Sequence, residues 1–206
     1  MIRTAQTPAR STLLLLLSLT LALGIVGCGK KVTRISANST TDLSGRWNDT
    51  DSRLVAEEML RDCLNSSWYF PYQTSKKSPT VIVGSVNNKS HEHIDAETFI
   101  KDMERTLINS GKVDFVANKA EREQLRDEKA DQASNASVET RRLAGEESGA
   151  ELMLIGSINS IVDKEGSKSV IFYQVNMELV NIESGRKLWI GDKKIKKYVS
   201  KNAVKL

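Results

Sequence analysis

Three runs of strand-forming residues at the end of this chain constrain its fold more than any other feature. They cover residues 152–162, 170–182 and 187–195, and each has the length and the apolar alternation of a β-strand. The two turns between them, 163–168 and 183–185, are short enough to join neighbouring antiparallel strands as hairpins. We therefore expect the chain to end in an antiparallel three-strand meander.

The first helical pattern begins next to three candidate N-caps, Asp49, Thr50 and Asp51. Apolar residues then recur every three or four positions, as on the buried face of an amphipathic helix. Residues 66–79, with two prolines and an aromatic cluster, break this pattern and predict a connecting segment. The predicted buried stripe consists of Leu54, Val55, Met59, Leu60, Cys63 and Leu64.

The middle of the chain alternates between strand and helix patterns. The predicted elements, in order, are a strand at 81–86, a helix at 95–109, a short strand at 113–116 and charged helices at about 118–132 and 138–148. Gly111 follows the helix at 95–109 in the position of a C-cap. The order predicts a single α/β domain, a mixed β-sheet flanked by about four helices and ending in the antiparallel three-strand meander.

Residues 81–87 and 153–159 share one pattern, an apolar run with an internal glycine. Such glycines are typical of central strands that backbone or a large side chain approaches closely. Neither run has the further glycines or the Lys-Ser/Thr of a phosphate-binding loop. We interpret them as two equivalent strands of the sheet.

The amino-terminal segment resembles the signal sequence of bacterial lipoproteins. Arg3 and Arg10 precede an apolar run at 13–26, which is shorter than the roughly 20 residues of a membrane span. Small or apolar residues then lead to Cys28, as in a lipobox. The resemblance implies that 1–27 is a signal peptide and that Cys28 is the lipid attachment site, carrying diacylglycerol and an acyl chain such as palmitate. A signal peptide or short anchor with a chance cysteine is the alternative.

Removal of that segment leaves a nearly neutral chain with a short tether. Without Arg3 and Arg10, 28 of the 30 basic side chains remain against 26 acidic ones, a net charge of +2. This balance gives no basis for a nucleic-acid partner. Residues 28–45 are polar and aperiodic, so we expect a flexible tether that extends at most about 65 Å to Trp47. The globular domain is expected at 46–206, close to the membrane.

The sequence offers little for catalysis or for a cofactor. Cys63 lies within an apolar helical stripe, where burial is the expected role and nucleophilic attack is disfavoured. His91 and His93 form a His-x-His pair that can bind zinc or copper, but no clear third ligand completes a site, and a solvated loop is the simpler interpretation. No Gly-x-Ser-x-Gly motif is present, although paired carboxylates cannot be identified from sequence. We expect a non-enzymatic protein without a cofactor or metal.

Short motifs distributed over 47–195 occur in a characteristic order. They are Ser85-Val86-Asn87-Asn88, Leu107-x-Asn109-x-Gly111-Lys112-Val113, Gly149-Ala150, Met177-x-Leu179-Val180, Ser184-Gly185 and Trp189-x-Gly191. In this order they resemble the LpoB family of outer-membrane lipoproteins. The resemblance implies a domain similar to the amino-terminal domain of TolB, without an active site, on the periplasmic face of the outer membrane. It also implies binding to a non-catalytic periplasmic domain of a bifunctional penicillin-binding protein, and so activation of peptidoglycan synthesis for the cell wall. Well-known members have a long proline-rich tether, whereas the tether here is short and lacks proline.

Two segments are candidates for contact with partners. The loop 87–93 follows a predicted central strand, where open sheets place binding groups, or it is only a connector. Its candidate partner-binding residues are Asn87, Asn88, Lys89, His91 and His93. The basic segment near the carboxyl end could meet anionic head groups, or it could protect an edge strand from aggregation. Its candidate membrane-contact residues are Lys193, Lys194, Lys196 and Lys197.

A second function from another class fits the same expected fold. A lipid-anchored, TolB-like domain could act as a structural assembly factor that holds together an envelope or secretion complex.

Overall fold

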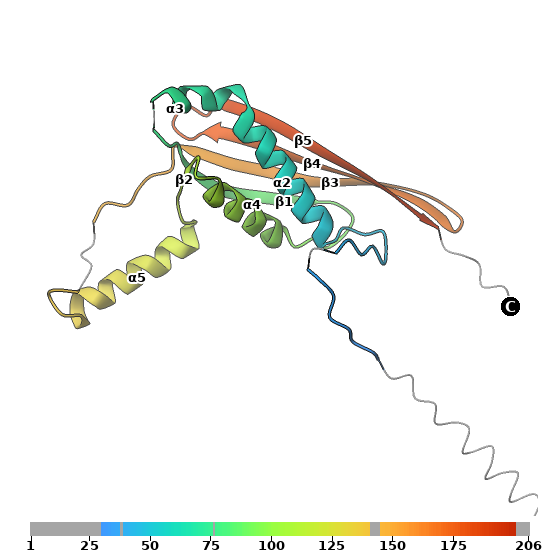
Figure 1. Ribbon diagram of the computed structural model, residues 1–206, viewed down its shortest axis with the longest axis horizontal. Coiled ribbons are helices and arrows are strands. Elements are labelled where there is room, and N and C mark those ends of the chain that lie inside the picture. The colour runs from blue at the N-terminus through green and yellow to red at the C-terminus, as the bar shows by residue number, and fades with distance from the viewer. Residues whose placement is uncertain (1–29, 38, 76, 141–144, 201–206) are drawn as a thin grey trace, which may run out of the picture. The chain divides into compact units, whose positions relative to one another are not determined.

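The computed structural model describes residues 30–37, 39–75, 77–140 and 145–200. The chain divides into two compact units between Ser39 and Thr40, and the fold below is that of the second. Its described strands are β1 (Thr80–Lys89), β2 (Asp114–Phe115), β3 (Leu152–Glu165), β4 (Lys168–Asn181) and β5 (Lys187–Ser200). They form one mixed sheet in the order β2-β1-β3-β4-β5, visible in Figure 1.

The predicted meander is confirmed, and its strands are longer than expected. β3, β4 and β5 each have 14 residues. They pair antiparallel along their lengths, and Figure 1 shows them side by side. β1 pairs in parallel with β2 and with β3. The sheet is therefore parallel on one side and antiparallel on the other, which is the mixed sheet that the order of elements predicts.

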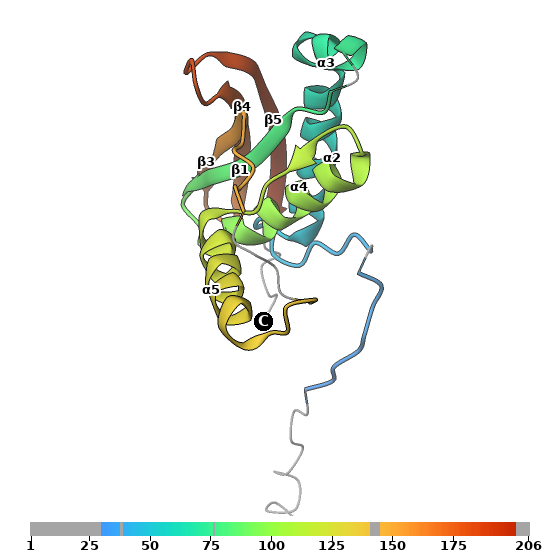
Figure 2. The same cartoon turned by 90° about the vertical axis from the view of Figure 1, so that its left-hand side faces the viewer.

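Helices α2 (Asp49–Asn65) and α4 (Ala96–Ser110) cover one face of the sheet (Figure 1 and Figure 2). α4 is capped as predicted: Asp95 accepts the Glu97 backbone N–H at 2.9 Å, and Gly111 ends the helix with a φ of 63°. α2 is capped by Asn48, one residue before the predicted candidates, in a capping box with Asp51.

The core lies between these two helices and the sheet. Alternate residues of the strands point into it, because side chains alternate between the faces of a strand. The fully buried side chains include Val55, Leu60, Phe99, Met103, Val81, Leu152, Leu154, Ile158, Tyr173, Val175, Met177 and Leu179. Cys63 is buried as predicted, and burial raises the pKa of its thiol to about 12.

The helix predicted at 138–148 is wrong for the part of it that the structure describes. Residues 138–140 form a turn and 145–148 have no regular structure, while 141–144 lie outside the described residues. Gly145 falls within this segment, and glycine in a helix interior costs about 1 kcal/mol relative to alanine. The charged helix before it is present as α5 (Lys119–Asn135), whose described residues include no buried side chain.

Two further differences concern the first helical region. The segment predicted as a connection contains a 3₁₀ turn (Ser67–Tyr69) and helix α3 (Phe70–Ser75), since Pro71 occupies the first turn of a helix, where proline is tolerated. Leu54, assigned to the buried stripe, is 48% exposed at the edge of α2. The other five members of that stripe are buried.

The two similar glycine-containing runs are neighbouring parallel strands, β1 and β3. A Cβ atom on Gly84 would lie 3.0 Å from the side chains of Ile155 and Met153. A Cβ atom on Gly156 would overlap Met177 and lie 2.5 Å from the Asn176 carbonyl oxygen. Both glycines thus stand where neighbouring atoms approach closely, as predicted.

Gly156→Ala is expected to destabilise the domain by about 1–3 kcal/mol, because the added methyl group has no space beside β4. Urea unfolding of the two proteins measures this difference. Gly149→Ala is the matched control, since a Cβ atom there would meet no described atom within 4 Å. Equal loss of stability in both variants would contradict the steric argument.

Candidate functional site

The loop that follows β1 is held in one conformation by its own side chains. The Asn88 amide donates to the carbonyl oxygens of Glu92 at 2.8 Å and Ile94 at 3.3 Å. Its carbonyl oxygen accepts from the Ser90 backbone N–H at 2.9 Å and hydroxyl at 2.7 Å. Asparagine is suited to such turns because its short amide reaches nearby backbone groups. Asn88 therefore shapes the loop from within.

Glu92 connects this loop to the rest of the domain. Its carboxylate accepts from the Trp47 backbone N–H at 3.1 Å and the Tyr173 hydroxyl at 2.8 Å, and lies 3.2 Å from His91 Nε2. The Glu92 side chain is only 10% exposed. Burial and the nearby Glu92 charge raise the pKa of Tyr173 above its usual range, so its phenol stays a proton donor. His91 is also tied to β3 through its backbone N–H, 3.0 Å from Ser160 Oγ.

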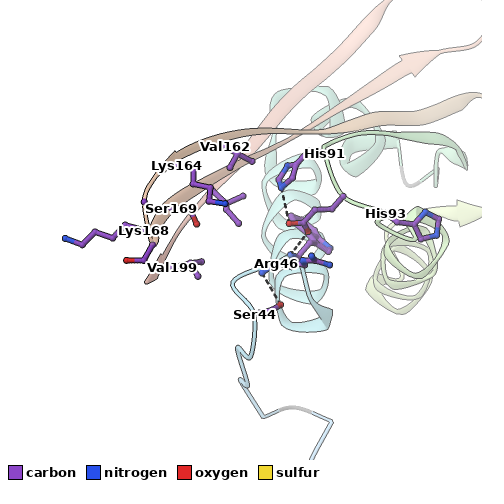
Figure 3. Close-up of a pocket in the computed structure, with 14 residues that line it drawn as sticks. Ser44, Arg46, His91, His93, Val162, Lys164, Lys168, Ser169 and Val199 are labelled. Carbon is purple, nitrogen blue, oxygen red and sulfur yellow. Dashed lines mark hydrogen bonds and ion pairs between the residues drawn. The ribbon is translucent and has the colours of Figure 1, made fainter. Parts of the chain in front are cut away.

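A cleft of about 540 Å³ opens beside this loop (Figure 3). One wall is the end of the β3–β4 hairpin, and the other is the loop with residues 44–47. Its apolar lining consists of Trp47, Val162, Ile171 and Val199, and its polar lining of Ser44, Arg46, His91, Glu92, His93, Lys164, Ser167, Lys168 and Ser169. In Figure 3, His93 and Lys168 point away from the cleft.

Residues 42–47, which we term the clasp, lie against the end of β5. Lys197 Nζ lies 2.6 Å from Asp51 and 2.9 Å from Asp42 and donates to the Arg46 carbonyl oxygen at 3.0 Å. Gly45 has a φ of 68° and contacts Val199 so closely that no side chain would fit. Most of the clasp belongs to the stretch predicted as a free tether, so the chain is already attached to the domain at Asp42.

The clasp is expected to weaken in acid. The hydrogen bond and the charge of Lys197 lower the pKa of Asp42 below 3.8, against a smaller effect of burial. Because the folded-state pKa is the lower one, this stabilisation is present above about pH 4 and is lost as the pH falls through the folded value. Asp42→Asn should therefore reduce the free energy of unfolding at pH 7, and the difference from the unmodified protein should disappear toward pH 2.

Urea unfolding over this pH range measures the effect. Asp163→Asn is the control, since Asp163 has no ion pair among the described residues. A difference for Asp42→Asn that does not change with pH would contradict the ion-pair assignment. At the alkaline end, burial lowers the pKa of Lys197, but its bonds to Asp51 and Asp42 outweigh this and raise it. The ion pair should thus persist beyond pH 10.5.

The structure separates the nine candidate contact residues onto different surfaces. Asn87 and Lys89 point to the sheet face opposite α2 and α4, beside a shallow polar groove. Among the basic residues, Lys193 pairs with Glu58 and Lys197 with Asp42 and Asp51 on the helical side. Lys194, which pairs with Asp192, and Lys196 point to the opposite face. Cys28 lies outside the described residues.

The polar groups around the cleft hydrogen-bond within the domain and so hold the shape of the loop and of the clasp. Within the described residues, no three His, Cys, Asp or Glu side chains are placed to hold a metal ion. In the same residues, no helix has the length and hydropathy required to cross a membrane. The predicted signal segment lies outside this part of the chain.

Sequence reasoning missed three residues that define the site. Trp47, Glu92 and Tyr173 are separated by 45 and 81 residues along the chain, so no local pattern connects them. The only local signal was a carboxylate between two histidines, and the strand pattern at 170–182 did not reveal the hydroxyl partner of Tyr173.

Comparison with known proteins gives one family match. A family model described as peptidoglycan-synthase activator LpoB matches residues 51–195. Among solved structures, the LpoB C-terminal domain from Escherichia coli is 20% identical over 73% of this chain and 99% of that chain, with a TM-score of 0.43. The same domain from Salmonella enterica is 18% identical over 70% and 98%, with a TM-score of 0.42. Lipoprotein GNA1162 from Neisseria meningitidis is 13% identical over 61% and 88%, with a TM-score of 0.36. No curated protein matches the chain.

Proposed function

The chain belongs to the LpoB family of peptidoglycan-synthase activators, and from this premise we propose that it is a lipid-anchored, non-catalytic protein that binds and stimulates a bifunctional penicillin-binding protein. The observation that carries the proposal is the family match over residues 51–195, which spans α2 to β5 and so nearly the whole folded domain. An activator needs a stable surface more than reactive groups. The ordered loop after β1 supports that role, since Asn88 and Glu92 fix its shape.

Anchoring is proposed at Cys28, with the domain at the periplasmic face of the outer membrane. Lipidation at one cysteine with several acyl chains gives a far firmer attachment than a single myristoyl chain. The contact surface is proposed around Asn87, Lys89 and His93, which are exposed at the end of β1. Lys194 and Lys196 are the proposed membrane-surface contacts, because they are exposed on β5.

The test is affinity capture from detergent-solubilised envelopes with the full-length protein, followed by mass spectrometry. Enrichment of a bifunctional penicillin-binding protein is the expected result. Glycan polymerisation by that enzyme should then rise when the protein is added and stay unchanged when the protein has been heat-unfolded. Repeated capture of an envelope or secretion complex without any synthase would overturn the proposal in favour of a structural assembly role.

A further inference from the structure

The cleft between the β3–β4 hairpin and the clasp has a charge that the domain itself does not neutralise. Arg46 and Lys164 line it, and within the described part of the chain neither side chain forms an ion pair. Lys193 and Lys197 of the neighbouring strand, by contrast, each pair with carboxylates. Arginine and lysine side chains attract carboxylate and phosphate groups, arginine in a bidentate manner.

The acidic side chains near the cleft do not neutralise Arg46 and Lys164. Glu92 is the carboxylate of the cleft lining; it forms no ion pair with Arg46 or Lys164 among the described residues, and its single negative charge is outnumbered by their two positive charges. Asp163 and Glu165 flank Lys164 on β3, but alternation along the strand directs them to the opposite face. The cleft is therefore left with an unbalanced positive charge.

Uncharged groups complete the lining. Ser169 lies directly opposite Lys164 in the β3–β4 ladder, so the two side chains leave the hairpin side by side and the serine adds a hydroxyl donor to the lining. Val162, Ile171 and Val199 give the same cleft an apolar base. A volume of about 540 Å³ falls within the range of small-molecule sites. Positive side chains, a hydroxyl group and an apolar floor suit a small cyclic ligand that carries a carboxylate or phosphate group.

We propose that this cleft binds an anionic saccharide, whose carboxylate or phosphate group lies between Arg46 and Lys164 while its ring packs against the apolar base. No covalent step is involved. The proposal concerns a ligand site and stands independently of which protein partner the domain activates. A carboxylate and a phosphate group could each pair with Arg46 and Lys164. The experiment therefore tests one sugar that carries a carboxylate and another that carries a phosphate.

Isothermal titration calorimetry on the full-length protein in detergent tests this with three matched sugars. N-acetylglucosamine is neutral, N-acetylmuramic acid adds a carboxylate, and N-acetylglucosamine 1-phosphate adds a phosphate. We expect at least one charged sugar to bind about two- to thirtyfold more tightly than the neutral one, the range for two exposed ion pairs. That preference should fall as salt is raised. The charged sugar that binds shows whether the cleft accepts a carboxylate or a phosphate group.

The double variant Arg46→Gln, Lys164→Gln should lose this preference, whereas Lys77→Gln should retain it. Lys77 is a matched control because it is exposed, has no ion pair among the described residues and precedes β1, at the other end of that strand from the cleft loop. Urea unfolding of each variant shows whether it remains folded. Equal binding of all three sugars, binding of none, or an unchanged preference in the double variant would overturn the proposal. Failure to capture a synthase would not affect this result.

Discussion

Glu92→Ala is expected to lower the free energy of unfolding by about 2–5 kcal/mol, a large fraction of the stability of a typical domain. The substitution leaves the Trp47 backbone N–H and the Tyr173 hydroxyl without their acceptor. Both hydrogen bonds are only partly exposed, so water from the adjacent cleft replaces the lost carboxylate incompletely. An unsatisfied buried donor costs about 1–3 kcal/mol, and here two donors are affected.

Urea unfolding measures this loss, and two further variants show whether hydrogen bonding is its cause. Glu92→Gln keeps an acceptor oxygen and should cost less than Glu92→Ala. Glu97→Ala removes a carboxylate from the exposed first turn of α4 and should change stability by less than about 1 kcal/mol. A Glu92→Ala protein as stable as the Glu97→Ala protein would show that the hydrogen bonds to Glu92 contribute nothing to the free energy of unfolding.

Cys28→Ser is expected to move nearly all of the protein from the membrane pellet to the soluble fraction. Serine has no thiol to alkylate, so neither diacylglycerol nor the later acyl chain is attached. The buried chains would provide about 0.8 kcal/mol for each CH₂ group, far more than surface lysines contribute. Fractionation with metabolic labelling by palmitate measures both attachment and location.

Cys63→Ala is the matched control for this change. Cys63 is buried in the core, with its thiol pKa raised to about 12, so its removal should leave labelling and membrane association intact. A Cys28→Ser protein that still labels and sediments with membranes would exclude Cys28 as the anchor. Sedimentation without label would instead indicate a retained apolar segment.

The fold could be predicted where burial imposes a period on the sequence. β4 alternates buried and partly exposed residues along most of its length, and α4 places Phe99, Met103 and Leu107 on one face. The helix expected at 138–148 failed because its charged pattern suits a solvated helix and an irregular segment equally well. α3 was missed because its proline and aromatic residues are also typical of a connection.

The candidate site could be predicted only in part, because its contacts are long-range. Asn88 was identified as a contact residue, but it accepts and donates inside its own loop. Lys193 and Lys197 were grouped with Lys194 and Lys196, although strand alternation divides the four between two faces. Helix α2 carries the acidic partners Glu58 and Asp51 to one face of the sheet. Tertiary packing decides which face that is.

The clasp also determines where mechanical force enters the domain. A pull along the residues that precede Asp42 reaches the ion pair with Lys197 before it reaches the sheet. Next in line are the Gly45 contact with Val199 and the Trp47 backbone hydrogen bond to Glu92. These few contacts can open one after another before the long ladder that holds β5 to β4 begins to separate. The clasp would thus act as a releasable length of tether, extending the reach of the domain without unfolding it.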